Sequence, residues 1–275
     1  MRHSITSRFR GTLLGATLGE TINNPSQIIL TPSAKIIISG AQSLIKLGRF
    51  EPESWLETFL QLELTPLQAV VATLPLALFC HDNKIKLRQN LLLAAKIWSN
   101  EPVMQESILA VGYAIAQALT EKLSFKDLIP QIVDFINAPS TELTDKLQQV
   151  QALLEQKAGL ELAVAQITKN KSSIASSVAL AFYYFLSTVE DLPLSVKRSK
   201  KSPTSSAIVG ALSGAYNSAS SIPSSWQRLT GVKTNTDLEM LKLSDSLVAV
   251  WSGVYDSEAK LITMAVAAPR VIRSR

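Results

Sequence analysis

A run of cations stands just before a segment expected to form a helix from Ser205. Four cations fall between Lys197 and Lys201, on what we expect to be a short loop. Cations beside a helix N-terminus could bind a phosphate group, because the exposed N–H groups and the helix dipole also favour an anion there. The alternative is a solvated basic loop without a ligand.

Two other candidates carry weaker signals. Cys80, His81 and Asp82 resemble a fragment of a nucleophile site, but side chains of adjacent residues point in different directions, so a structural or surface role is favoured. Glu20 is either a residual acid or, as for most lone carboxylates near a helix end, part of a cap or an ion pair.

The composition narrows the class of protein. The 275 residues are 47% apolar and 18% charged, which argues against disorder, and the single Cys80 excludes an intramolecular disulfide framework and a cysteine-rich zinc site. A net charge of +5 is mild, so nucleic acid is not expected as a partner. With one cysteine and no export signal, we expect a cytoplasmic protein.

The apolar residues recur with helical spacing, and strand-like alternation is almost absent. The longest strongly apolar run, Ala69 to Cys80, is about half the length needed to cross a bilayer and is broken by Thr73 and Pro75, so no transmembrane segment is expected. The sequence predicts one all-α domain over residues 1–251 and a basic tail over residues 252–275. The expected helices are Ser7–Thr21, Ser33–Leu47, Glu51–Leu62, Pro66–Phe79, Leu87–Ser99, Met104–Leu119, Phe125–Ile136, Thr141–Lys157, Glu161–Lys169, Ser173–Ser187, Ser205–Ala219, Ser224–Leu229 and Asp237–Trp251.

The first expected helix carries a stripe of glycines. Gly11, Gly15 and Gly19 are four residues apart and therefore lie on one face. The bare backbone on this face predicts that another helix packs closely against it.

Three segments in order resemble the ADP-ribosylglycohydrolase family, of the dinitrogenase reductase-activating glycohydrolase type. Residues 8–20, RFRGTLLGATLGE, are similar to the family's opening R-x-R-G-x-L-L-G-x-x-x-G-D. Residues 30–33, LTPS, precede an expected helix where the family has Thr-Asp-Asp. Residues 207–216, AIVGALSGAY, with the later Ile222, Pro223 and Trp226, resemble the stretch that closes the family's active site.

The resemblance implies an all-α domain with two magnesium or manganese ions held by carboxylates from two loops. This sequence departs from the family at those positions. Thr31 keeps the hydroxyl of the family's Thr-Asp-Asp, but Pro32 and Ser33 replace its two carboxylates. Lys201 and Pro203 stand at two further Asp positions. Gln27 falls on a position that is often Glu. We expect four missing carboxylates to abolish the metal centre, because a lysine adds charge of the wrong sign and a proline side chain has no donor atom.

These departures predict a metal-free, catalytically inactive relative that needs no cofactor. It would be retained for binding an ADP-ribose-like or other phosphorylated ligand, or a protein partner. The residues expected to line the vestigial cleft are Gln27, Thr31, Ser33, Lys200, Lys201 and Thr204. Two alternatives stay open, namely an active glycohydrolase with an unrecognised site around Glu20 and a structural scaffold whose cleft has closed.

Overall fold

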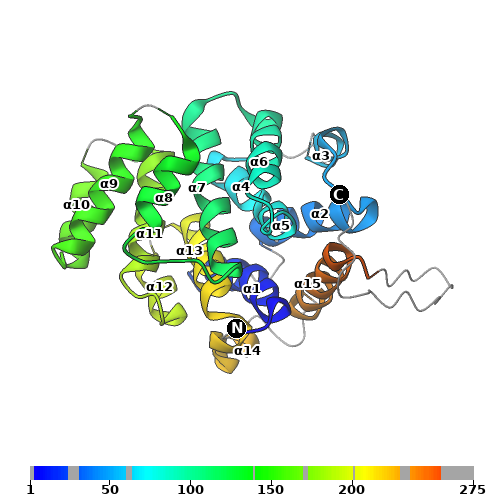
Figure 1. The fold of residues 1–275 in the computed structure, drawn as a ribbon. Helices are drawn as coiled ribbons and strands as arrows, with labels where there is room; N and C mark the ends of the chain where they lie inside the picture. Colours follow the sequence, from blue (N-terminus) through cyan, green and yellow to red (C-terminus); the bar gives the residue numbers. More distant parts are fainter. Residues whose placement is uncertain are drawn as a thin grey trace.

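The structure of the protein is a computed structural model. It describes residues 3–23, 31–59, 64–138, 140–169, 173–200, 202–229 and 236–254. No strand occurs in these ranges, and the prediction of an all-α fold is confirmed (Figure 1). The helices are α1 (Ile5–Asn23), α2 (Pro32–Leu47), α3 (Pro52–Phe59), α4 (Pro66–Ala72), α5 (Leu74–Phe79), α6 (Lys84–Trp98), α7 (Pro102–Leu119), α8 (Leu128–Ile136), α9 (Glu142–Glu155), α10 (Leu160–Thr168), α11 (Ile174–Leu186), α12 (Leu192–Arg198), α13 (Pro203–Asn217), the 3₁₀ turn η1 (Ala219–Ser221), α14 (Ser224–Leu229) and α15 (Thr236–Ser252).

The centre of the fold is the close pairing of α1 with α13. A Cβ atom built on Gly15 would lie 2.2 Å from the carbonyl oxygen of Gly210, and one on Gly11 would lie 2.4 Å from that of Gly214. As the residue number increases along α1, the number of the contacting residue on α13 decreases, so the two helices run antiparallel. The prediction that the glycine stripe receives another helix is confirmed.

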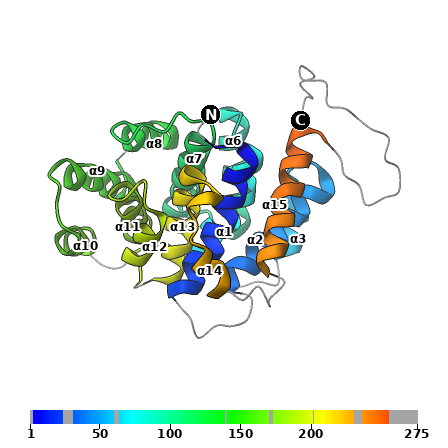
Figure 2. The ribbon, with the colours of Figure 1, turned by 90° about the horizontal axis from the view of Figure 1, so that it is seen from below.

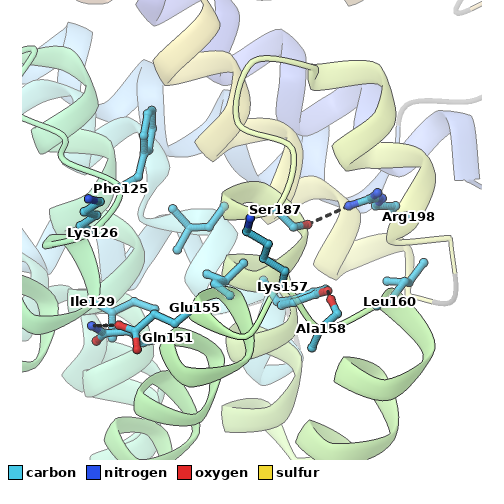
Figure 3. A pocket seen from close by; sticks show the side chains of 14 residues that line it. Phe125, Lys126, Ile129, Gln151, Glu155, Lys157, Ala158, Leu160, Ser187 and Arg198 are labelled. Carbon is cyan, nitrogen blue, oxygen red and sulfur yellow. Dashed lines mark hydrogen bonds between the residues drawn. The ribbon is translucent and has the colours of Figure 1, made fainter.

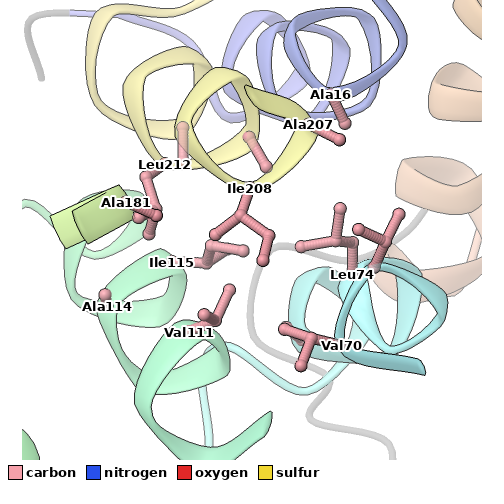
Figure 4. Packing of buried hydrophobic residues seen from close by; sticks show 14 of the residues in the cluster. Ala16, Val70, Leu74, Val111, Ala114, Ile115, Ala181, Ala207, Ile208 and Leu212 are labelled. Atoms are coloured by element: carbon pink, nitrogen blue, oxygen red, sulfur yellow. The ribbon is translucent and has the colours of Figure 1, made fainter. Parts of the chain in front are cut away.

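The core lies beneath this pair, where α13 packs on α4 and α7 and α5 packs on α1 and α7. Figure 4 shows Ile208 and Leu212 of α13 above Val111 and Ile115 of α7, with Leu74 of α5 beside them. Each of these side chains is at most 1% exposed. Their burial removes apolar surface from water, which is the main favourable contribution to folding.

The expectation of one helix over Pro66–Phe79 is wrong, because the helix is interrupted at Thr73. The Thr73 hydroxyl donates to Val70 O at 2.8 Å, and Thr73 N–H donates to the same carbonyl at 3.2 Å. Pro75 has no N–H and its ring would clash with the carbonyl four residues earlier in a continuous helix. A new helix, α5, therefore begins immediately after the break.

Peripheral helices flank the centre on two sides. Figures 1 and 2 agree in placing α9 and α10 at one end of the molecule and α2, α3 and α15 at the other. No helix among the described residues is long and apolar enough to cross a membrane. The predicted basic tail falls almost wholly on residues 255–275, which lie outside the described residues.

Candidate functional site

The three segments that carry the family resemblance meet where α1 ends and where α2 and α13 begin. Gly19 packs on the first turn of α13, since a Cβ atom there would lie 2.3 Å from Ser206 O. The next residue, Glu20, is buried, and its Oε2 accepts a hydrogen bond from Ser33 N–H at 3.1 Å. The helix starts are therefore held together by backbone packing and by one buried carboxylate.

The start of α2 is fixed by Thr31. This residue has extended dihedral angles, φ −63° and ψ 155°, and its hydroxyl oxygen accepts from Ala34 N–H at 3.2 Å. Pro32 follows in the first turn, where its missing N–H costs nothing. The Ser33 hydroxyl is fully buried and has no hydrogen-bond partner among the described residues. Thr31 is thus occupied as a cap, whereas Ser33 Oγ is free to accept a partner.

The start of α13 is fixed by a group of serines. The Ser206 hydroxyl lies 2.9 Å from Ser199 O and 3.0 Å from Ser202 O, and the Ser199 hydroxyl lies 2.8 Å from that of Ser206. Ser202 caps the helix by accepting from Ser205 N–H at 3.3 Å. These contacts tie the end of α12 to the first turn of α13.

The predicted cleft residues are brought together only in part. Thr31 and Ser33 begin α2, while Thr204 is half-buried in the first turn of α13 and Lys200 is exposed just before it. Among the described residues, no hydrogen bond joins the first two to the last two. Gln27 and Lys201 lie outside the described residues.

The expected basic loop is different in the structure. Lys197 and Arg198 form the last turn of α12 rather than a loop. The Arg198 guanidinium is directed to α11, where Nη1 donates to Ser187 Oγ at 2.9 Å. The prediction of four cations on one loop is therefore wrong. Among the described residues, Lys200 is the cation in the connection between α12 and α13.

The residues described at the helix starts do not fit a pair of divalent cations. Such ions need several converging anionic oxygens. Pro203 offers no donor atom, the Thr31 hydroxyl caps α2, and the Glu20 carboxylate already accepts from Ser33. Nowhere in the described part of the chain do three His, Cys, Asp or Glu side chains come together in a way that could hold a metal ion.

The Cys80 and His81 segment is part of the packing. His81 is buried, its Nδ1 lies 2.7 Å from Leu78 O, and its ring lies 4.8 Å from that of Trp251 and 5.6 Å from that of Phe9. Asn90 donates to Cys80 Sγ at 3.3 Å. These contacts support the structural role that the sequence favoured.

A cavity of about 630 Å³, for which the sequence carries no signal, lies among α8, α9, α10, α11 and α12 (Figure 3). Its lining includes Phe125, Lys157, Tyr183 and Arg198, which are scattered over more than 70 residues of sequence. No local spacing connects such residues, so only the three-dimensional arrangement shows the cavity.

The helices and their order define an all-α domain of a known kind. A solved structure described as "ADP-ribosylglycohydrolase-related protein complex" matches 88% of this chain and 99% of that chain, with a TM-score of 0.61 and 14% sequence identity. This similarity shows the fold. The family model for ADP-ribosylglycohydrolase matches residues 53–257, and the chain belongs to this family. A comparison with curated proteins finds no match.

Proposed function

We propose that this member of the family does not hydrolyse ADP-ribosyl bonds and instead binds a phosphorylated ligand without metal. The observation that carries the proposal is the donor set at the two helix starts. Two prolines and a serine, Pro32, Pro203 and Ser33, stand there at positions where the family uses carboxylates to hold metal ions.

The start of α13 is the better place for the anion. The α2 N-terminus already faces the Glu20 carboxylate, which offsets its favourable field for a second anion. At α13, Ser202 takes only Ser205 N–H, and Thr204 adds a half-buried hydroxyl. Lys200 supplies positive charge in the same connection. Pro203 has no N–H and Ser205 N–H is taken by Ser202, so a phosphate oxygen would have the Thr204 N–H and a cation available.

Glu20 is better explained as a cap than as a catalytic acid. Its carboxylate is buried and accepts from a backbone N–H at the start of α2, a favourable position for a negative charge. The alternative of an active glycohydrolase centred on Glu20 therefore has less support.

We also propose the cytoplasm as the compartment. The similar structure is described as a complex, which supports a search for a protein partner of this chain.

Calorimetric titration with ADP-ribose in the presence of a chelator tests the proposal. We expect saturable heat that decreases as salt rises, because added ions screen the attraction between cations and phosphates. Thr204→Val should weaken binding about tenfold, since it removes a hydrogen bond to a charged group. The matched control is Thr168→Val, a half-buried threonine at the end of α10.

The outcomes separate the hypotheses. Binding without metal that Thr204→Val weakens and Thr168→Val does not supports the proposal. Absence of heat with ADP-ribose and with other phosphorylated analogues would favour a scaffold with a closed cleft. Cleavage of an ADP-ribosylated protein that Glu20→Gln abolishes, while its melting temperature is kept, would favour an active enzyme.

A further inference from the structure

The cavity among α8–α12 is separate from the helix starts described above. Its walls come from the connection before α8, the end of α9, the turn into α10 and the ends of α11 and α12. Glu20, Thr31, Ser33 and Thr204 do not line it. Its volume of about 630 Å³ lies in the range of cavities that hold small organic ligands.

Much of the wall is apolar. Ile129 is buried behind it, and Leu154, Leu160 and Leu186 are half-buried around it. Phe125 stands at the rim with 43% of its surface exposed. This ring is held in place from outside the cavity by Tyr216, with ring centroids 5.3 Å apart and planes at 66°. A fixed, exposed ring beside apolar walls suits a flat apolar group.

The charged residues of the lining are mostly positive. The lining contains three cations, Lys126, Lys157 and Arg198, and one carboxylate, that of Glu155. This carboxylate accepts a hydrogen bond from Gln151 Nε2 at 3.0 Å. None of the three cations forms an ion pair within 4.0 Å with a carboxylate of the described residues. The cavity therefore has an excess of positive charge that the described chain does not neutralise.

Lys157 is placed by the turn that ends α9. Its backbone is left-handed, with φ 52°, and Ala158 N–H donates to Leu153 O at 2.9 Å. The Tyr183 hydroxyl donates to Ala158 O at 2.7 Å and so ties this turn to α11. Figure 3 shows the Lys157 side chain projecting toward Ser187, with Arg198 beyond it. Two cations thus approach the same end of the cavity, Lys157 from the turn after α9 and Arg198 from the end of α12.

We propose that this cavity binds a small organic anion that has a flat apolar body and one acidic group. The body would lie against Phe125 and the leucines, and the acid would lie between Lys157 and Arg198. The free N–H groups of both cations can donate to a carboxylate, while Ser187 keeps the guanidinium in position. This site is independent of the proposed ADP-ribose site.

Titration calorimetry with 2-naphthoate, and with the neutral 2-naphthamide of nearly the same shape, tests the proposal. We expect the carboxylate to bind at least about tenfold more tightly than the amide, the gain given by a charge-assisted hydrogen bond. Lys157→Gly should weaken naphthoate binding about fivefold to tenfold. Glycine suits the left-handed backbone, so the variant should melt no lower than the parent, and reduced binding cannot be attributed to unfolding. The control is Lys96→Ala, an exposed lysine on α6.

Equal affinity for naphthoate and naphthamide would overturn the proposal, and so would naphthoate binding that Lys157→Gly and Arg198→Met both leave unchanged. Naphthoate binding that Thr204→Val weakens, with no effect of Lys157→Gly, would assign the probe to the start of α13 and overturn this site alone. Naphthoate binding that depends on Lys157, in a protein that does not bind ADP-ribose, would support this site while rejecting the proposed function.

Discussion

Gly210 and Gly15 face each other across the α1–α13 interface with no room for a side chain. A Cβ atom on Gly210 would lie 1.9 Å from Gly15 O and 2.5 Å from Gly15 C. Both atoms belong to backbone, so relief requires the two helices to move apart. The contact explains why glycines recur along both helices.

We therefore expect Gly210→Ala to lower the free energy of unfolding by about 3 kcal/mol, at the upper end of the cost of overpacking a core. The control is Gly40→Ala on α2, where a Cβ atom would meet its nearest neighbour, Ala72 O, at 3.4 Å. Because alanine is the better helix former, this control should be neutral or stabilising by up to about 1 kcal/mol. Urea denaturation measures both, and equal effects would contradict the packing argument.

Two arginines of the first helix should differ in their contribution to stability. Arg8 is 4% exposed, with Nη2 donating to Glu121 Oε1 at 2.8 Å and Nη1 donating to Ala118 O. Arg8→Met removes the ion pair of a buried guanidinium with the partly exposed Glu121 and its hydrogen bond to Ala118 O, so a loss of about 2 kcal/mol is expected.

The second arginine forms an exposed pair. Arg10 donates to Asp245 at 2.7 and 2.6 Å, but both side chains are about 40% exposed. Arg10→Met should cost no more than about 1 kcal/mol, and the loss should shrink in 1 M salt. Thermal melts of both variants at two salt concentrations check the contrast, which would be refuted by a larger loss for Arg10 than for Arg8.

Glu106 should make stability depend on pH. Burial raises the pKa of the Glu106 carboxyl above its ordinary value, although the hydrogen bond that Thr141 donates partly offsets this. A raised folded-state pKa means that the favourable contribution is complete below the unfolded value, near 4.5, and is lost as pH rises through the folded value.

Glu106→Gln removes this titration and keeps an acceptor for Thr141. The variant should be more stable than the parent at pH 7, and its advantage should shrink as the pH falls toward 4.5. Denaturation at pH 7 and pH 4.5 measures the difference, with the exposed Glu57→Gln of α3 as the control. An advantage that grows in acid would show that the sign is wrong.

Gly159 offers a place to add a helix cap. It precedes α10 with φ −68° and ψ 160°, close to the angles of the capping residue Thr31, and it provides no side-chain acceptor. A Cβ atom there meets no neighbour within 4 Å. Gly159→Ser should raise the free energy of unfolding by about 0.5 to 1 kcal/mol, whereas Gly159→Ala, which cannot accept, should gain less. Equal stabilities of the two variants would show that no cap forms.

The close helix pair was predictable because its signal is local. Gly11, Gly15 and Gly19 share a face of any helix, whatever surrounds them. Helix α12 is absent from the expected helices, although its signals are also local: Asp191 accepts from Leu194 N–H at 2.9 Å, and Pro193 stands in the first turn. Aspartate and proline are also frequent in turns, but an acidic cap followed by proline is a typical helix start.

The candidate site was predictable only as far as the family resemblance extends along the chain. The resemblance assigns the end of α1 and the starts of α2 and α13 to one site, and in the structure the end of α1 contacts each of the two helix starts. It did not predict that Glu20 would bond to Ser33 or that Arg198 would turn toward Ser187, because both contacts depend on how separate helices pack. The cavity beside Lys157 depends on the same packing and leaves no sequence motif.

The central claim is that the metal centre of the family has been lost in this chain. Metal binding can be measured without knowing the substrate, so thermal melting with millimolar Mg²⁺ or Mn²⁺ after chelator treatment is the most direct test. A ligand that binds only the folded protein must raise its melting temperature. We predict that neither ion changes the melting temperature, and a saturable rise of several degrees would contradict the claim.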